Sequence, residues 1–247
     1  MGTGKVNYRI TRDYHTHTIY SDGKNTIEQN IIAAREKGLK GIGITEHGPR
    51  HLTYGIKREN ISVVRDTIQK LRKIYEDIEI YFGIEANIIN KGNHIDIDPH
   101  EFADFDYVMA GYHYGVMGGF CVSNFFNKHA PVKANDKKLL IRNTDMMVKA
   151  VYENNLKILT HPGDKGPFDI DEVAKACEKT DTLMEINSRH KYLSEEGIRI
   201  AKKYDIKFVI NSDAHSTEKI GDMGTGLERA LAAGLDMSRV INVDSVY

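Results

Sequence analysis

Three polar side chains near the start of the chain could hold a metal ion together. His15 and His17 lie two residues apart, and Asp22 follows in a Ser-Asp-Gly turn. Side chains two apart on a β-strand point the same way, so a strand that ends in His-x-His directs two imidazoles to one point. Two neutral imidazoles and a carboxylate can bind a transition metal. Two surface histidines beside a turn would look the same, so the rest of the chain must decide.

Side chains that can bind metal recur where the other expected strands end. In a parallel barrel the carboxyl ends of the strands form one rim, and active sites lie there. A single histidine at a strand end is more often an ordinary polar residue, but seven strand ends in register are hard to explain by coincidence. The candidate metal ligands are His15, His17, Asp22, His47, Glu85, His113, His161, Asp213 and His215. The histidines away from the strand ends are expected to be ordinary surface residues: His51, His94, His100, His129 and His190.

The number of candidate ligands indicates more than one metal ion. A catalytic zinc needs only about three protein ligands, so nine suit three divalent ions if Glu85 bridges two of them. In such clusters, ions roughly 3.5–4 Å apart stabilise the attacking and leaving oxygens of a phosphoester, and a hydroxide that bridges two ions can be the nucleophile. We therefore assign no catalytic residue beyond the metal ligands. Zinc is the expected metal, with manganese or iron as alternatives, because imidazole and carboxylate suit all three.

Alternating strands and helices must position these side chains. Short β-branched runs alternate with helical patterns, which predicts βαβ units and a mainly parallel sheet. Thr26 and Gln29 predict a capping box at the start of the first helix, and Gly38 marks its end. The expected strands cover residues 8–14, 41–47, 78–87, 107–113, 157–163, 182–188 and 207–215, and the later helices cover 60–76, 137–154, 171–179, 194–204 and 225–233. Two stretches, 86–106 and 113–135, are too long for short turns and are typical of functional or disordered loops.

Length and composition predict one soluble α/β domain over residues 1–247. A chain of 247 residues suits a single α/β barrel, and 28% charged with 40% hydrophobic residues is typical of a globular protein. The net charge of -1 shows no bulk preference for nucleic acid or membrane. We expect a cytoplasmic protein with no membrane association, because the start lacks the apolar core of a signal peptide and no apolar run approaches the ~20 residues of a membrane span. Cys121 and Cys177 are then expected to be free thiols.

Seven short motifs make the chain similar to the PHP (polymerase and histidinol phosphatase) superfamily. They are HTHTIYSDG, GITEHG, GIEAN, AGYH, THPG, EINS and NSDAH, in the order of that family. The resemblance extends from about Asp13 to the last helix and is strongest to the stand-alone bacterial phosphatase branch. It implies a distorted seven-stranded (β/α)7 barrel, similar to a TIM barrel, with a trinuclear metal site at the C-terminal rim of the strands and phosphoesterase activity.

The resemblance also implies how the ligands divide among the ions. Glu185 would support the cluster through hydrogen bonds without binding a metal. The family's Thr-Asp-His-Gly reads Thr-Glu-His-Gly here, so Glu46 keeps the charge but moves it, and its supporting role is open. Arg189, after EINS, could bind a phosphate with two hydrogen bonds or be a solvated surface residue. By this likeness one metal takes His15, His17, Glu85 and Asp213, a second takes Asp22, His47 and His215, and a third takes Glu85, His113 and His161.

The function predicted from these residues is metal-dependent hydrolysis of a small phosphomonoester. One alternative is a phosphodiesterase or exonuclease, although the near-neutral charge and the lack of a basic stretch interleaved with aromatic residues argue against extended nucleic-acid binding. A histidinol-phosphate phosphatase is a specific option within the phosphatases. A metal-stabilised module without catalytic activity is a further alternative, although such copies are expected to have lost ligands. The sequence predicts neither the physiological substrate nor the oligomeric state.

Overall fold

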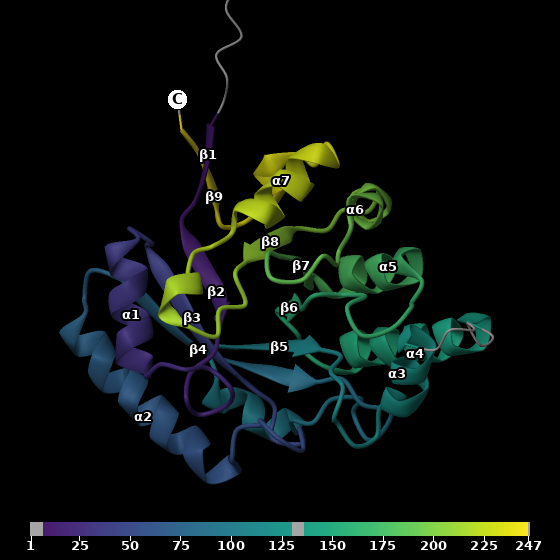
Figure 1. Ribbon diagram of the computed structural model, residues 1–247, viewed down its shortest axis with the longest axis horizontal. Helices are drawn as coiled ribbons and strands as arrows, with labels where there is room; N and C mark the ends of the chain where they lie inside the picture. Colours follow the sequence, from purple (N-terminus) through teal and green to yellow (C-terminus); the bar gives the residue numbers. More distant parts are fainter. Residues whose placement is uncertain (1–6, 130–135, 247) are drawn as a thin grey trace, which may run out of the picture.

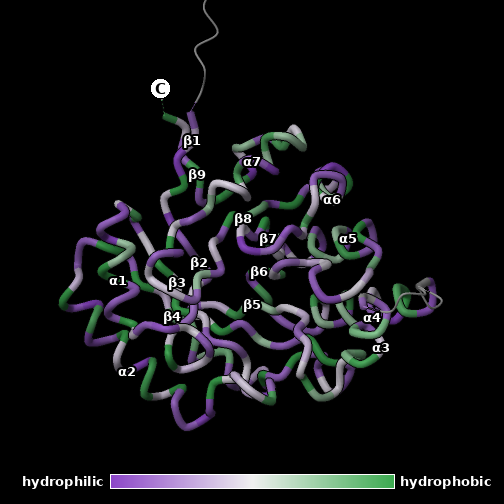
Figure 2. The backbone as a smooth tube through the Cα atoms, in the orientation of Figure 1, coloured by the Kyte–Doolittle hydropathy of each residue, from purple (hydrophilic) through white to green (hydrophobic). Residues whose placement is uncertain are grey.

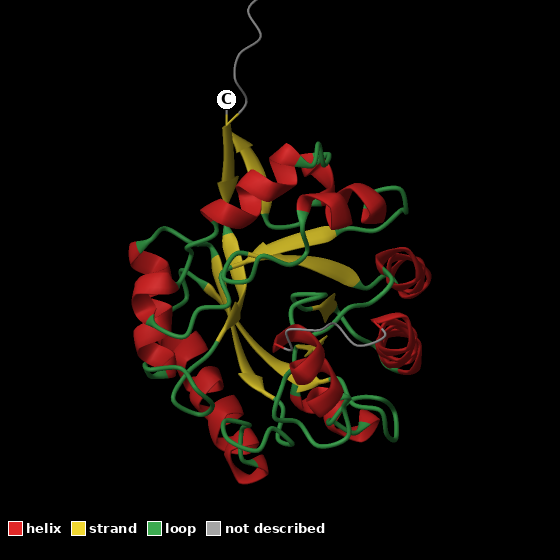
Figure 3. Cartoon of the chain, turned by 45° about the vertical axis from the view of Figure 1, so that its right-hand side comes forward, coloured by secondary structure: helices red, strands yellow, loops and turns green. Residues whose placement is uncertain are grey.

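Seven parallel strands curve into a barrel with helices on its outside (Figure 1; Figure 3). The computed structural model describes residues 7–129 and 136–246. The strands follow one another around the sheet in chain order, and every neighbouring pair is parallel. A bridge between Thr16 and Ala214 joins the first strand to the end of the last, so the barrel is nearly closed. The strands are β2 (Arg12–Thr16), β3 (Gly41–His47), β4 (Glu79–Asn87), β5 (Tyr107–Gly111), β6 (Ile158–Leu159), β7 (Leu183–Asn187) and β8 (Phe208–Asn211).

The helices lie in the connections between strands and cover the outside of the barrel, as Figure 3 shows. Their apolar faces pack on the sheet, and apolar and polar residues alternate along them (Figure 2). In the connection from β4 to β5, a 3-10 helix takes the place of an α-helix. The α-helices are α1 (Ile27–Glu36), α2 (Arg58–Ile74), α3 (Cys121–His129), α4 (Asp136–Glu153), α5 (Ile170–Thr180), α6 (Glu195–Ala201) and α7 (Gly224–Ala232), and the 3-10 helices are η1 (Pro99–Asp104), η2 (Thr217–Lys219) and η3 (Met237–Arg239).

Local sequence signals account for the first two helices. The Thr26 hydroxyl accepts from the Gln29 backbone N–H while the Gln29 side chain accepts from Thr26, so the predicted capping box is confirmed. Gly38 has φ +69°, a left-handed conformation that suits the chain reversal after α1. In α2 the residues spaced three and four apart are buried against the barrel, as the amphipathic pattern predicts. They are Ile61, Val64, Ile68 and Leu71.

The strand prediction at the beginning of the chain was wrong in one respect. The run expected as a single strand over 8–14 divides at Thr11 into β1 (Asn7–Ile10) and β2. β1 leaves the barrel and pairs antiparallel with β9 (Val243–Val246), a strand that no local pattern predicted. The two termini therefore lie side by side in a separate two-stranded ribbon (Figure 1).

Both long loops contain structure of their own. In 86–106 an isolated antiparallel bridge joins Ile88 to Ile95, and η1 follows. In 113–135, a helix, α3, occupies the middle where only a loop was expected, and residues 130–135 lie outside the described part of the chain. β6 is only two residues long, which makes the barrel irregular on that side. None of the helices in the described residues is long and apolar enough to span a membrane.

Candidate metal centre

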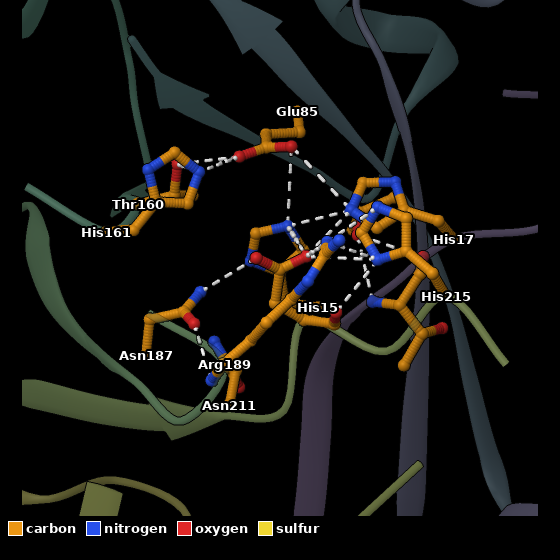
Figure 4. Close-up of polar contacts among 12 residues, drawn as sticks. His15, His17, Glu85, Thr160, His161, Asn187, Arg189, Asn211 and His215 are labelled. Carbon is orange, nitrogen blue, oxygen red and sulfur yellow. Dashed lines mark hydrogen bonds and ion pairs between the residues drawn. The ribbon is translucent and has the colours of Figure 1, made fainter. Parts of the chain in front are cut away.

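The carboxyl ends of the barrel strands bring all nine predicted ligands into one cluster. Figure 4 shows several of these side chains directed toward one another from different strands. His47 and Glu85 lie within β3 and β4, whereas His113 and His161 follow β5 and β6 by two residues. Each of the nine has a nitrogen or oxygen atom within 3.7 Å of another member. The structure therefore brings the nine side chains together at one rim of the barrel.

Glu85 lies between two subsets of the cluster. Its Oε1 is 3.3 Å from His113 Nε2 and 2.8 Å from His161 Nε2. Its Oε2 is 3.4 Å from His15 Nε2 and 3.7 Å from His17 Nε2. The carboxylate is fully buried, and its Oε2 is also 2.8 Å from His47 Nδ1, so the two oxygens face different sets of histidines. This arrangement is the one that a bridging carboxylate needs.

A second subset gathers around Asp22 on the more open side of the cluster. Asp22 Oδ1 is 3.1 Å from His215 Nε2 and 3.4 Å from His47 Nε2. The His17 ring stacks on that of His47, with 4.2 Å between ring centroids. Asp213 Oδ1 lies 3.3 Å from His17 Nε2 and connects this subset to the first. His17, Asp22, His47 and His215 present atoms that all lie within 4.8 Å of one another, which is close enough for one ion.

Buried polar partners fix how two of the imidazoles face the cluster. His15 Nδ1 donates to Glu185 Oε1 over 2.8 Å, and His113 Nδ1 donates to Asn87 Oδ1 over 2.8 Å. When such a ring is neutral, its Nε2 atom faces the cluster with a free lone pair. A hydrogen bond from the other ring nitrogen is what orients a metal-binding histidine. Glu185 therefore contacts His15 on the side of the ring that faces away from the other candidate ligands, and its other oxygen accepts from the His161 backbone N–H.

The distances between the side chains suit ligands of shared divalent cations better than direct contacts between neighbouring side chains. His15 Nε2 lies 3.1 Å from His17 Nε2, and His113 Nε2 lies 3.2 Å from His161 Nε2. Two ligands on one zinc at about 2.0–2.1 Å in tetrahedral geometry would lie roughly 3.3–3.4 Å apart, so these pairs have the spacing of shared ligands. Several buried atoms of the candidate ligands also lack a hydrogen-bond partner in the described part of the protein. Buried polar atoms are normally paired, and a bound ion is one explanation for an exception. They are His17 Nδ1, Asp22 Oδ1, His47 Nδ1, Glu85 Oε2 and Asp213 Oδ1.

The electrostatics of the cluster keep its carboxylates ionised. Burial alone would raise the pKa of Glu85, but the imidazoles of His113, His15 and His47 outweigh burial and hold that pKa well below its usual range. Burial lowers the pKa of His113 to about 4, so this imidazole is neutral at pH 7. The pKa of His17 is also lowered well below its ordinary value, by burial and by the neighbouring His47. Ionised carboxylates and neutral imidazoles are the forms that bind metals.

Two other histidines of the cluster have raised pKa values, which favour the charged ring with protons on both nitrogens when no cation is present. Burial opposes the charge on His47, but Glu85 and Asp22 raise its pKa to about 9. In the same way Glu185 and Glu85 outweigh burial and raise the pKa of His15 well above its ordinary value. Metal binding must therefore release protons from these rings.

The backbone is in an uncommon conformation at two candidate ligands. His161 has φ +25° and Asp213 has φ +54°, in the left-handed region that residues other than glycine rarely adopt. Hydrogen bonds hold both segments: Glu185 Oε2 accepts from the His161 backbone N–H over 2.7 Å, and Ala214 donates to the His15 carbonyl over 3.3 Å. Backbone strain of this kind persists where the surroundings determine the conformation, commonly at functional sites.

Glu46 and Arg189 occupy different places relative to the cluster. Glu46 is fully buried and accepts from the backbone N–H of Thr18 over 3.1 Å and from the hydroxyls of Thr18 and Ser21, so it shapes the turn that presents Asp22. Arg189 is half exposed, and its Nη1 lies 2.7 Å from His215 Nδ1 and 3.5 Å from Asp213 Oδ1 (Figure 4). The guanidinium therefore lies at the edge of the cluster.

The surface assignment of the remaining histidines was wrong for three of them, including His94, whose side chain is 14% exposed. His51 is buried, with its ring stacked on Tyr54 at 3.4 Å between centroids, because the segment after β3 folds back against Tyr114. His190 is partly buried, and its Nε2 lies 3.2 Å from Asp213 Oδ2. His100 and His129 are exposed as expected, and His94 forms an ion pair with Glu153.

Sequence reasoning missed a set of amide and hydroxyl residues that hold the ligands in place. They lie inside the quoted motifs, but neither amide nor hydroxyl side chains suggest a metal site by type. Asn187 Nδ2 donates to Glu185 Oε2 and to Asp213 Oδ2, over 2.9 and 3.2 Å. The residues of this kind are Asn87, Thr160, Asn187 and Asn211.

A barrel of parallel strands with a buried histidine and carboxylate cluster at its C-terminal rim defines this protein as a metal-binding barrel of the kind that metal-dependent hydrolases use. The chain belongs to the PHP domain family, whose model matches residues 13–195, and a PHP-associated family model matches residues 194–241.

Relatives and solved structures agree with the family. A protein of Shewanella halifaxensis named "Probable phosphatase" is 28% identical over 245 residues, which cover 93% of this chain and 87% of that protein. The "DNA polymerase/3'-5' exonuclease PolX" of Bacillus subtilis is 27% identical over 250 residues, 96% of this chain but only 40% of that protein. Histidinol phosphate phosphatase from Lactococcus lactis, solved with zinc, L-histidinol and phosphate, shares the fold with a TM-score of 0.62 and 16% identity, over 92% of this chain and 94% of that chain.

Proposed function

We propose that this PHP-family protein is a metal-dependent phosphatase that hydrolyses small phosphomonoesters. The observation that carries the proposal is the convergence of nine buried or half-buried imidazoles and carboxylates, several with unsatisfied atoms, at the rim where barrel active sites lie. The naming of the Shewanella relative as a phosphatase and the phosphate and zinc of the Lactococcus structure support the same chemistry.

The proposed centre holds three divalent ions. Glu85 would bridge two of them, because its two oxygens face different sets of histidines. Zinc is the first candidate, with manganese or iron as alternatives, since the ligand types suit all three. When bound, the ions would supply an activated water and charge neutralisation for in-line attack on phosphorus. One ion would be held by His15, His17, Glu85 and Asp213, a second by Asp22, His47 and His215, and a third by Glu85, His113 and His161.

The substrate would enter through a hollow beside Asp213 and His215. This hollow has a volume of about 490 Å³ and is lined by both residues and by Arg189. Arg189 would donate to the non-bridging phosphate oxygens, since a guanidinium matches the geometry of a phosphate. A hollow of this size suits a small ester more than an extended strand.

Metal removal and restoration is the experiment that tests the proposed function. The purified protein should hydrolyse a generic aryl phosphate, lose this activity after a chelator, and regain it with added zinc or manganese. Asp213→Asn should remain folded by circular dichroism but lose activity, and Asp145→Asn on the exposed face of α4 is the matched control. Hydrolysis that survives complete metal removal would contradict the proposal. Metal-dependent thermal stability with no hydrolysis of any phosphoester would favour a non-catalytic module.

Phosphodiester hydrolysis is the second candidate, because the PolX protein is similar along nearly the whole of this chain. The two activities are separated by comparing an aryl phosphate with single-stranded DNA under identical metal conditions. Histidinol phosphate belongs in the same comparison, as the substrate class of the Lactococcus neighbour. A phosphatase should prefer the monoesters, whereas release of nucleotides from DNA at a higher kcat/KM would support the exonuclease.

A further inference from the structure

A buried carboxylate lies behind the cluster in the loop between β4 and η1. Asp96 is 2% exposed and sits between the buried Ile95 and Ile97. Its Oδ1 accepts from the Asn87 backbone N–H over 2.7 Å, and its Oδ2 accepts from Asn87 Nδ2 over 2.7 Å and from the Arg50 backbone N–H over 2.9 Å. Asp96 contacts none of the candidate ligands, so the proposed metal centre does not explain why it is retained in the interior.

The hydrogen bonds of Asp96 determine which way the Asn87 amide faces. Asn87 Nδ2 donates to Asp96 Oδ2 and also to the Gly48 carbonyl, over 2.7 and 3.0 Å. A carboxylate and a carbonyl only accept, so the NH2 group of Asn87 must point to that side. Its Oδ1 is left on the other side, 2.8 Å from His113 Nδ1, where it can only accept.

Asn87 Oδ1, which faces His113 Nδ1, determines the tautomer of the His113 ring. Nδ1 must carry the proton in order to donate to Asn87 Oδ1. In a neutral ring, Nε2 then has a free lone pair, which faces His161 Nε2 at 3.2 Å and Glu85 Oε1 at 3.3 Å. If the Asn87 amide were reversed, Nδ1 would become an acceptor and Nε2 would direct a proton into the cluster.

We propose that Asp96 is a positioning residue that orients the Asn87 amide and thereby fixes His113 in the tautomer that can bind a metal. Gly48 completes the arrangement, because a Cβ atom at this position would lie 2.3 Å from Asp96 Oδ1. The loop over residues 88–98, which follows β4, thus acts through two hydrogen-bonded steps on a candidate ligand at the end of the neighbouring strand β5. The metal part of this inference rests on the proposed function, whereas the tautomer of His113 does not.

The variant Asp96→Asn tests the chain of hydrogen bonds with almost no change in size. With the new NH2 group in place of Oδ1, a donor would face the Asn87 backbone N–H, which cannot turn. In place of Oδ2 the NH2 group faces the Arg50 backbone N–H, which cannot turn either, and the Asn87 side chain, which can turn and present its oxygen. Each orientation thus leaves one backbone N–H without its acceptor, but only the second reverses Asn87 and moves the proton of His113 from Nδ1 to Nε2. The variant should therefore populate both tautomers of His113, whereas the wild type populates one. Asp98→Asn, in the same loop but exposed, is the matched control.

The first readout is the tautomer of His113 in the full-length, metal-free chain. Nitrogen NMR of histidine-labelled protein reports which ring nitrogen carries the proton, and the His113 signals are identified by their loss in His113→Gln. We expect the Nδ1–H form in the wild type and in Asp98→Asn, and the Nε2–H form or a mixture in Asp96→Asn. An unchanged Nδ1–H tautomer in a folded Asp96→Asn protein would overturn the inference.

The second readout is zinc binding, measured by competition with a chromophoric chelator. Loss of a partner that orients a ligand typically weakens metal affinity about 10- to 100-fold, so Asp96→Asn should show that loss at one ion and Asp98→Asn none. Equal affinity in Asp96→Asn and wild type would refute the role of Asp96 in metal binding. If the wild type itself bound no zinc, the proposed function would fail, but the tautomer measurement would still decide the inference.

A second variant covers the case in which Asp96→Asn does not fold. Asn87→Ala leaves the Asp96 carboxylate in place but removes the whole amide, both the oxygen that accepts from His113 and the NH2 group that donates to Asp96 and Gly48. The metal-free protein should then populate both tautomers of His113, with weakened binding at one ion. A purely structural role of this network would lower the melting temperature of the metal-free protein and leave the tautomer and the zinc affinity unchanged, which would contradict the proposal.

Discussion

Replacing Glu185 by glutamine should weaken the metal centre through His15. The carboxylate accepts four hydrogen bonds: Oε1 from His15 Nδ1 (2.8 Å) and Asn211 Nδ2 (2.9 Å), and Oε2 from the His161 backbone N–H (2.7 Å) and Asn187 Nδ2 (2.9 Å). Glutamine keeps one oxygen, so its NH2 group must face two of these donors. The backbone N–H of His161 cannot turn, whereas His15 can move its proton from Nδ1 to Nε2. We therefore expect the NH2 group to face His15.

The size of the effect follows from this choice of orientation. An unsatisfied buried donor costs about 1–3 kcal/mol, and the tautomer change of His15 leaves one such donor, on Asn211. For a chain of this size, each kcal/mol lowers the melting temperature by about 2–4 °C, so Glu185→Gln should melt about 2–12 °C lower. Because His15 Nε2 then carries a proton toward the cluster, metal affinity should fall about 10- to 100-fold in addition.

Thermal unfolding with and without zinc, together with chelator competition, measures both quantities. Glu196→Gln on the exposed face of α6 is the control and should match the wild type, because the Glu196 side chain is 73% exposed. A lower melting temperature with unchanged zinc affinity would refute the link from Glu185 to His15 and leave Glu185 a purely structural residue. An unchanged melting temperature would refute the expectation that glutamine leaves one buried donor unsatisfied.

Three further outcomes are expected. Zinc binding at pH 7 should release about two protons, from His15 and His47, because their pKa values are raised in the metal-free protein, that of His47 to about 9. Calorimetry in buffers of different ionisation enthalpy counts the released protons. For the same reason zinc affinity should rise with pH up to about pH 9. Thr26→Ala should lower the melting temperature by about 2–4 °C through loss of about 1 kcal/mol of N-cap stabilisation, with zinc affinity unchanged in the same titration. Iodoacetamide at pH 8 should leave Cys177 unmodified until the protein is denatured, because burial raises its thiol pKa to about 12, and mass spectrometry should find the label on Cys121 alone.

The ligands could be predicted from the sequence because the barrel repeats one geometric rule. Each parallel strand ends at the same rim, so side chains such as His47 and Glu85, distant along the chain, acquire a common position once their strands are recognised. Burial does not enter this rule, and for that reason His51 and His190 could not be placed. Their positions depend on how a loop packs, which a local pattern does not encode.

Two parts of the fold could not be predicted because their stabilising contacts are not local or not amphipathic. β1 pairs with β9 from the opposite end of the chain, so neither strand shows its partner in the surrounding sequence. In α3 the apolar Val122, Phe125 and Phe126 are exposed while the polar Asn124 is buried. This pattern is the reverse of the usual one, in which the apolar stripe of a helix faces the core.

Asn124 also shows why the amides of the metal centre gave no signal. A buried asparagine is retained for the direction of its donor and acceptor, and that direction depends on partners that only the fold supplies. Asn87 faces His113 with its oxygen because Asp96 and Gly48 accept on the other side. The residue type of a ligand states its chemistry, whereas the residue type of an orienting amide does not. Prediction from sequence therefore reaches the groups that would bind the cations and stops before the groups that decide which of their atoms face the cations.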